Sequence, residues 1–270
     1  MQKKIFMLGL SILILGGLSF AFAVFLVFAA RRFKISEDPL VAKIEEILPG
    51  TNCGACGFAG CHALSELLAG RKAEPGACVT GGPEAAKKIA ALLGVTANVA
   101  ELRVASIHCQ GGKSKARSRF EYVGIKTCLS SHTTAGGPKA CFYGCLGLGD
   151  CVRVCPFNAL SMNKDDLPVV DENKCVACGK CVAVCPRKII TLVPRRKWTY
   201  VGCISKDRGK AVKDVCSVGC IGCGICAKVT KSGAITMEDN LPRLQIDKGL
   251  DFEKAVQRCP AHCFVVRGLK

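Results

Sequence analysis

Eight cysteines between positions 141 and 185 constrain this chain more than any other feature. They fall into two groups, and each group ends in Cys-Pro, at Cys155-Pro156 and at Cys185-Pro186. The second group has the spacing C-x₂-C-x₂-C-x₃-C-P and consists of Cys175, Cys178, Cys181 and Cys185. Short gaps of this kind let one tight loop wrap a cubane, and nearby glycines let backbone N–H groups approach its sulfides. The spacing therefore predicts 4Fe–4S clusters.

Zinc and disulfide bonds explain the same cysteines less well. Tetrahedral zinc sites usually pair two C-x₂₋₄-C knuckles, or one knuckle with histidines. Closely spaced C-x₂-C runs also differ from the scattered cysteines of a small secreted fold. Two clusters in one small fold favour electron conduction, because a structural role needs only one; a purely structural role stays open as the alternative.

The second group resembles the cysteine run of two-cluster bacterial ferredoxins. In that family three thiolates of a run hold one cluster, and the fourth crosses over to the other cluster. The resemblance implies one cluster on Cys155, Cys175, Cys178 and Cys181 and a second on Cys141, Cys145, Cys151 and Cys185. The first group departs from the pattern, since Leu148 stands where a middle cysteine is usual. We interpret Cys141 as the replacement for that cysteine.

The N-terminal stretch predicts a membrane anchor. Ile5 to Ala30 contains no charged residue, and its length suffices to cross about 30 Å of hydrocarbon. A cleaved signal peptide is the competing interpretation, but the apolar run exceeds the usual h-region of about 7–15 residues. Arg31 and Arg32 follow the span and favour its C-terminal side in the cytoplasm. Thiols stay reduced there, so we expect a single span with the cysteine domains inside.

A small helical module follows the anchor. Asp38 and Pro39 predict a helix start, as N-cap and first helical residue. Further helices are expected to end at Gly70 and to run from Pro83 to Gly94. Four cysteines with C-x₂-C-x₄-C-x₁₆-C spacing lie in this module, namely Cys53, Cys56, Cys61 and Cys78. They predict a one-cluster site, with zinc as the alternative.

Residues 97–138 carry weaker signals. Val99 to Ile107 is compatible with a strand, and Gly111 to Arg119 is a basic run that we interpret as a solvated loop. Two cysteines of this stretch, Cys109 and Cys128, have no neighbouring cysteine in the sequence.

The C-terminal residues 215–266 repeat residues 140–192 in a decayed form. Cys141, Cys145 and Cys151 correspond to Cys216, Cys220 and Cys226, whereas Thr230 stands where the repeat has Cys155. The run of Cys175, Cys178 and Cys181 has no counterpart, but Cys185-Pro186 survives as Cys259-Pro260. Under the crossover rule, this half keeps one complete ligand set: Cys220, Cys223, Cys226 and Cys259.

Five cysteines then remain: Cys109, Cys128, Cys203, Cys216 and Cys263. The first four could hold a fifth cluster, and unligated buried thiols are the alternative.

The order of these motifs resembles the B subunit of Rnf-type complexes. The resemblance covers the anchor, the C-x₂-C-x₄-C-x₁₆-C module, the stretch C-F-Y-G-C-L-G-L-G-D-C-V-R-V-C-P-F and the second cysteine run. The Rnf family is membrane-bound and moves electrons between ferredoxin and NAD while pumping Na⁺ or H⁺. The resemblance implies soluble ferredoxin and the membrane and flavin-bearing subunits as partners, with flavin and NAD bound elsewhere.

The charge balance agrees with such partners. The formal net charge of +17 falls to about +9 when four clusters, each with a charge of −2 including its thiolates, are counted. A basic protein suits a membrane surface, an acidic protein or a nucleic acid. We find no recognition helix or repeated basic motif, so we expect no nucleic acid partner.

We therefore expect an α+β protein with five parts. These are a transmembrane anchor (1–34), a small helical 4Fe–4S module (35–96), a linker region (97–138), a complete two-cluster ferredoxin domain (139–195) and a degenerate one-cluster domain (196–270). We expect an electron-transfer subunit of an ion-translocating oxidoreductase without substrate chemistry of its own. The alternatives are the iron–sulfur subunit of a hydrogenase or formate dehydrogenase and, from another class, a redox-sensing protein.

Overall fold

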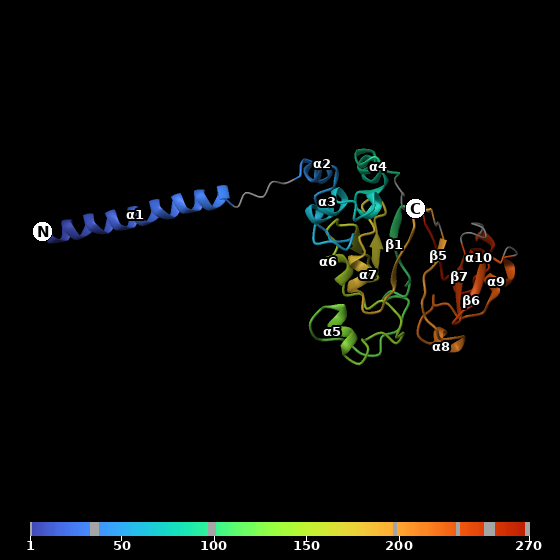
Figure 1. Ribbon diagram of the computed structural model, residues 1–270. Coiled ribbons are helices and arrows are strands. Elements are labelled where there is room, and N and C mark those ends of the chain that lie inside the picture. Colours follow the sequence, from blue (N-terminus) through green and yellow to red (C-terminus); the bar gives the residue numbers. More distant parts are fainter. Residues whose placement is uncertain are drawn as a thin grey trace. The chain divides into compact units, whose positions relative to one another are not determined.

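The computed structural model describes residues 2–32, 38–96, 101–196, 199–230, 233–245 and 252–267. The chain divides into two compact units, 1–43 and 44–270, and each is described by itself. The mixture of helices and short strands (Figure 1) confirms the expected α+β class.

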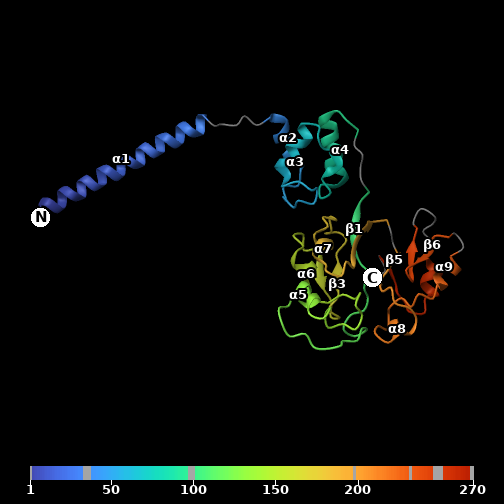
Figure 2. The ribbon, with the colours of Figure 1, turned by 60° about the horizontal axis from the view of Figure 1, so that its bottom comes forward.

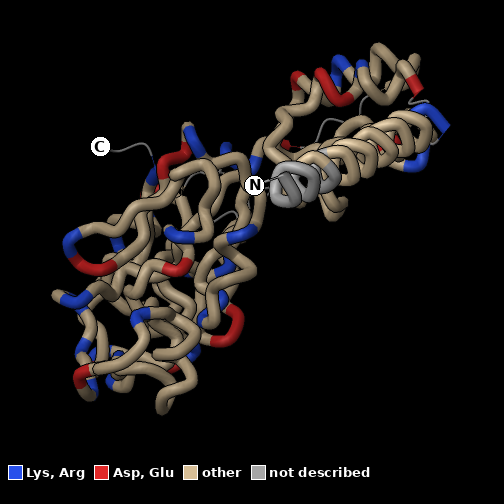
Figure 3. Tube along the Cα trace, turned by 90° about the vertical axis from the view of Figure 1, so that its left-hand side faces the viewer, with Lys and Arg blue, Asp and Glu red and all other residues tan. Residues whose placement is uncertain are grey.

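The first unit is dominated by helix α1, Gln2–Arg32. The segment Leu13–Arg32 is long and apolar enough to cross a membrane. Its apolar side chains, among them Phe20 and Phe25, are exposed. In the coloured part of α1 in Figure 3, charged residues occur only at the C-terminal end of the helix, where Arg31 and Arg32 lie. Such a surface is stable only against an apolar surrounding.

Helix α2, Pro39–Ile47, begins as the sequence predicts. The Oδ1 atom of Asp38 accepts a hydrogen bond of 2.8 Å from the backbone N–H of Leu40. This contact satisfies one of the free donors at a helix N-terminus.

The helical module of the second unit (Figure 2) contains α3, Cys61–Ala69, the 3₁₀ turn η1, Pro75–Ala77, and α4, Gly82–Leu93. Both helices end at the predicted glycines, Gly70 and Gly94. Gly94 has a φ of 66°, a left-handed conformation that suits glycine at a helix end. Leu64 and Ile89 are fully buried and form the apolar interior of the module.

The first ferredoxin-like half consists of four strands and three short helices. They are β1 Arg103–Ile107, α5 Cys128–Thr133, α6 Asp150–Arg153, β2 Leu160–Met162, β3 Pro168–Val170, α7 Lys180–Val184 and β4 Ile190–Pro194. Strand β1 pairs antiparallel with β4, and β2 pairs antiparallel with β3.

The second half repeats this plan. Its elements are β5 Thr199–Val201, α8 Lys210–Lys213, α9 Ile225–Val229, β6 Ile235–Glu238, β7 Leu241–Leu244, α10 Glu253–Gln257 and β8 Phe264–Val266. Strand β5 pairs antiparallel with β8, and β6 pairs antiparallel with β7. Thus β5 and β8 are the counterparts of β1 and β4, and the hairpin β6–β7 is the counterpart of β2–β3.

The stretch expected to be a linker region belongs to the first half where it is described. Strand β1 is an integral sheet strand, and the prediction of a strand ending at Ile107 is confirmed; Val99 and Ala100 lie outside the described residues. The basic loop is held by isolated bridges, Ala116 with Cys216 and Ser118 with Lys139. The first of these bridges joins the loop to the second half, together with the hydrogen bond from the backbone N–H of Arg117 to the carbonyl of Val215.

The two halves have separate cores, and each core contains cysteines. One core gathers Ile107, Leu160 and Ile190 around Cys145, Cys151 and Cys181. The other gathers Ile235, Leu241 and Phe264 around Cys220, Cys226 and Cys259. Aromatic residues make up only 6% of the chain. Cysteine side chains therefore occupy core positions that large aromatic side chains fill in many other proteins.

Candidate metal centres

All 21 cysteines are free thiols, and 20 of them lie in five groups of four. Site 1 is Cys53, Cys56, Cys61 and Cys78; site 2 is Cys155, Cys175, Cys178 and Cys181; site 3 is Cys128, Cys145, Cys151 and Cys185; site 4 is Cys109, Cys141, Cys203 and Cys216; and site 5 is Cys220, Cys223, Cys226 and Cys259. Across the described ranges, no three His, Cys, Asp or Glu side chains form a group that could hold a single metal ion. Sites 2 to 5 each line a cavity instead.

Site 1 lies where α3 begins and where η1 ends. The backbone N–H of Cys61 donates a hydrogen bond of 2.7 Å to Oδ1 of Asn52, which holds the loop against the start of α3. The backbone N–H of Gly81 approaches Cys78 Sγ at 3.3 Å. Burial raises the pKa of Cys78, and the charges of the other three cysteines raise it further. The four predicted ligands therefore lie together.

Site 2 lines a cavity of about 300 Å³ beside β1. The backbone N–H groups of Ala105 and Ala159 point at Cys175 Sγ and Cys155 Sγ, at 3.5 and 3.4 Å. Burial raises the pKa of Cys181 to about 11, and the charges of the other three sulfurs contribute. Cys155 comes from the first cysteine group, so the chain follows the crossover expected from the ferredoxin pattern.

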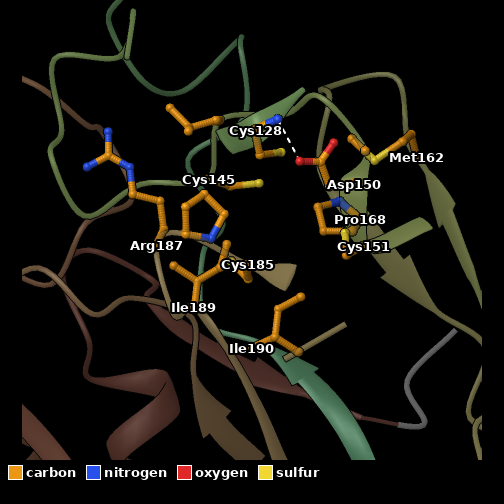
Figure 4. A pocket seen from close by; sticks show the side chains of 13 residues that line it. Cys128, Cys145, Asp150, Cys151, Met162, Pro168, Cys185, Arg187, Ile189 and Ile190 are labelled. Atoms are coloured by element: carbon orange, nitrogen blue, oxygen red, sulfur yellow. Dashed lines mark hydrogen bonds between the residues drawn. The ribbon is translucent and has the colours of Figure 1, made fainter. Parts of the chain in front are cut away.

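Site 3 lines a cavity of about 380 Å³ (Figure 4), and one of its members differs from the prediction. Cys145, Cys151 and Cys185 are present as expected, but the fourth cysteine is Cys128 and not Cys141. Burial raises the pKa of Cys151 to about 12, followed by the charges of Cys128 and Cys185. Cys128 was expected to be a lone cysteine or part of a fifth site with Cys109, Cys203 and Cys216.

The position of Cys128 has a local cause. Its sulfur accepts hydrogen bonds from the backbone N–H groups of Asp150 and Leu148, which partly offset the rise in its pKa caused by burial. Leu148 is the residue that stands in place of the usual middle cysteine. In addition, the carboxylate of the buried Asp150 accepts a hydrogen bond of 2.8 Å from the backbone N–H of Cys128. Cys128, the first residue of α5, thus places its thiol beside Leu148, where the usual cysteine is missing.

Cys141 lies in site 4, whose cavity of about 400 Å³ also contains Cys109, Cys203 and Cys216. Burial raises the pKa of Cys141, and the charges of Cys109 and Cys216 contribute. The grouping predicted from sequence placed Cys141 beside Cys145 because the two are close in the chain. The two cysteines instead belong to different cavities.

Site 5 lines a cavity of about 330 Å³, with Cys223 exposed and Cys220, Cys226 and Cys259 buried. Cys259 lies there although it is far from the others in sequence, whereas Cys216 lies in site 4. This is the placement that the crossover rule predicts for the decayed repeat. The hydroxyl of Thr230, the counterpart of Cys155, donates a hydrogen bond of 2.9 Å to the carbonyl of Cys226 and so closes the end of α9.

Cys263 is the one cysteine that belongs to none of the groups of four, but it also lines the cavity of site 5, where its sulfur lies 3.5 Å from Cys259 Sγ. The equivalence of the halves explains its position. In the first half the backbone N–H of His108 donates to the carbonyl of Ile189, and in the second half that of Gly202 donates to Cys263. Cys263 therefore occupies the place of Ile189, a buried core residue. We interpret it as a core thiol.

Comparison with known proteins agrees with this chemistry. A family model for an Fe-S cluster matches residues 48–80, and a model for a 4Fe-4S dicluster domain matches residues 140–189. The first covers site 1, and the second covers the two cysteine groups that contribute to sites 2 and 3. Iron–sulfur clusters of the 4Fe–4S type are therefore the cofactors that these residues fit.

Three relatives match nearly the whole chain. The B subunit of the ion-translocating oxidoreductase complex of Methanosarcina acetivorans is 42% identical over 95% of this chain and 97% of that protein. The B subunit of the Na(+)-translocating ferredoxin:NAD(+) oxidoreductase complex of Acetobacterium woodii is 42% identical over 93% of this chain and 75% of that protein. The proton-translocating counterpart of Clostridium ljungdahlii is 40% identical over 90% and 85%. The chain belongs to the family of B subunits of Rnf-type ion-translocating oxidoreductase complexes.

Proposed function

We propose that this chain conducts single electrons between soluble ferredoxin and the other subunits of its Rnf-type complex. A 4Fe–4S cluster, when bound, supplies a one-electron redox centre. The residues of the chain hold these centres, exclude water from them and fix their separations. The observation that carries the proposal is the close succession of sites 1, 2 and 3.

Two sulfur pairs show this succession. Burial raises the pKa of Cys178 in site 2, and the charge of Cys53 in site 1 is among the further causes. Likewise, the charge of Cys181 in site 2 contributes to the raised pKa of Cys151 in site 3. Charges influence each other in this way only over short distances within a protein. Cys151 of site 3 and Cys181 of site 2 also belong to one buried cluster, against which Cys155 packs. These contacts support a path through the three sites.

The ligands that we propose for sites 1, 2, 3 and 5 are their four cysteines each. Backbone N–H groups already approach the sulfurs, as a thiolate-bound cluster requires. Several thiols, including Cys145 with a pKa raised to about 12 by burial and by the charge of Cys109, are neutral in the cluster-free protein. Binding must release these protons, because the thiolate is the ligand.

We further propose that α1 anchors the chain by a single span, with the cysteine-bearing unit on the cytoplasmic side. Arg31 and Arg32 at the end of α1 support this orientation. The basic charge of the chain suits an acidic electron carrier on the same side. The names of two relatives specify the translocated ion, which is Na⁺ for the Acetobacterium woodii complex and H⁺ for the Clostridium ljungdahlii complex.

Ferredoxin-dependent reduction tests the proposal. Full-length protein in detergent, with its clusters reconstituted anaerobically, is mixed with reduced bacterial ferredoxin, and the bleaching of its visible absorption is followed. We expect bleaching that weakens as salt is added, because salt screens the attraction between a basic and an acidic protein. Protein that dithionite bleaches but reduced ferredoxin does not would contradict the proposed partner.

A further inference from the structure

Site 4 has the features of a metal centre in its own right. Its four sulfurs line one cavity, yet they come from four separate parts of the chain. Two lie just beyond strands, Cys109 after β1 and Cys203 after β5. The other two, Cys141 and Cys216, each stand four residues before a cysteine of site 3 or site 5. We infer that site 4 binds a fifth 4Fe–4S cluster, which joins the two ferredoxin-like halves.

The internal repeat places the four cysteines in equivalent pairs. The backbone N–H of His108 donates to Ile189 at 2.8 Å, and that of Gly202 donates to Cys263 at 2.7 Å. Cys109 and Cys203 are the next residues along, so they hold the same position in the two halves. Cys141 and Cys216 are counterparts in the repeated sequence. Each half therefore contributes the same two ligands to a site with approximate twofold symmetry.

Glycines surround this cavity closely. A Cβ atom on Gly111 would lie 3.0 Å from Cys216 Sγ and 3.9 Å from Cys109 Sγ. A Cβ atom on Gly144 would lie 3.6 Å from Cys141 Sγ. The backbone can thus approach the sulfurs, and the N–H groups of Val218 and Gly219 lower the otherwise raised pKa of Cys216. Such donors stabilise the negative charge of thiolate ligands.

A buried lysine supplies the second, independent indication. Lys139 is only 7% exposed, and its ammonium group donates a hydrogen bond to the carbonyl of Gly111 in the wall of site 4. Burial raises the pKa of Cys216 and of Cys145, and the positive charge of Lys139 offsets part of that rise. No ion pair joins it to a carboxylate in the part of the chain that the structure describes. A buried cation needs a nearby anion, and a cluster with four thiolates carries a net charge of about −2.

Site 4 also lies between two other sites. On one side, the backbone N–H of Cys145 in site 3 donates to Cys109 Sγ at 3.3 Å. On the other, the backbone N–H of Cys220 in site 5 donates to the sulfur of Cys203. A cluster there would accept one electron from the neighbouring site and give one electron to the next, with no bond made or broken. The five sites then form one unbranched path from site 1 to site 5.

Iron content of the full-length protein tests the inference. After anaerobic reconstitution, we expect about twenty irons per chain from five clusters of four irons. Cys203→Ser should reduce this number to about sixteen. The matched control is Cys263→Ser, which removes a cysteine that does not line site 4. Because Cys263 occupies a core position beside the four ligands of site 5, this change should leave the iron content unchanged.

Double variants test which cysteines share a site. Cys141→Ser added to Cys203→Ser should cost no further iron, because both changes damage site 4. Cys128→Ser added to Cys203→Ser should leave about twelve irons, because it also damages site 3. The opposite pattern would restore the grouping expected from the sequence and overturn the composition of site 4.

The iron content of the wild-type protein tests the fifth cluster even if a variant fails to fold. About sixteen irons per chain in fully reconstituted protein, or about sixteen with one zinc, would overturn a fifth iron–sulfur cluster. The electron-bridging role rests on the proposed conducting function, whereas the iron count does not. Twenty irons without reduction by ferredoxin would therefore contradict the proposed function and leave the metal site intact.

Discussion

Replacing Lys139 by Met should make the cluster at site 4 harder to reduce. The change keeps the length of the side chain but removes the buried positive charge and its hydrogen bond to the Gly111 carbonyl. Reduction adds one negative charge to the cluster, and the ammonium group stabilises that charge by attraction. The charge of Lys139 also offsets part of the rise that burial causes in the pKa of Cys145 in site 3, so a smaller shift of the potential is expected there.

The size of the shift follows from Coulomb's law. The Gly111 carbonyl that binds Lys139 belongs to a residue whose Cβ would touch Cys216 Sγ, so the ammonium lies within one side chain of the site. At about 7 Å and an effective dielectric constant of about 20, one unit charge is worth about 2.4 kcal/mol. For a one-electron couple, this corresponds to about 100 mV in the negative direction.

An EPR-monitored redox titration of full-length wild type and Lys139→Met measures this shift. Lys115→Met is the matched control, because Lys115 lies on the basic loop that also carries Gly111 but has an exposed side chain, so that water and salt screen its charge. Adding Cys203→Ser should abolish the shift assigned to site 4. An unchanged midpoint potential in a variant with full iron content, or a shift in the positive direction, would refute the reasoning.

Three further outcomes are expected. Cys259→Ser should cost site 5 its cluster, about four irons per chain, whereas Cys216→Ser should leave the EPR signal of site 5 in place; the reverse would contradict the crossover in the second half. Cys128→Ser should abolish the signal of site 3, and an intact site 3 signal would exclude the role given to α5. Removal of residues 1–34 should yield a soluble protein that keeps its clusters, as iron analysis and centrifugation would show; a native mature chain that begins near residue 30 would instead favour a signal peptide.

Local sequence predicted the local structure well. The N-cap at Asp38 and the helix ends at Gly70 and Gly94 depend on a few neighbouring residues, and all three are confirmed. The cysteines that were assigned to sites 1, 2 and 5 from the sequence also lie together in the structure. Site 1 follows from the spacing within one short module, and sites 2 and 5 follow from a crossover that the repeated motif preserves. The mixed fold with an apolar N-terminal helix is confirmed as well.

The exchange of Cys128 and Cys141 escaped prediction because it depends on contacts between distant segments. Nearness in sequence favoured Cys141 as the partner of Cys145, but α5 brings Cys128 to the backbone at Leu148. One available signal pointed the other way. The repeat equates Cys141 with Cys216, and Cys216 was already excluded from the ligand set of its own half, so the same exclusion applied to Cys141.

The twofold arrangement of site 4 has a consequence for how the protein matures. Two of its ligands come from each half, so the site is complete only after both halves have folded and met. Sites 1, 2, 3 and 5 each draw on one module alone and can be loaded earlier. A cluster at site 4 would therefore be inserted last, and it would cross-link the halves and limit the freedom of the unfolded chain as a long-range disulfide does. Oxidative loss of that one cluster would then weaken the contact between the two halves while the other four sites keep their clusters.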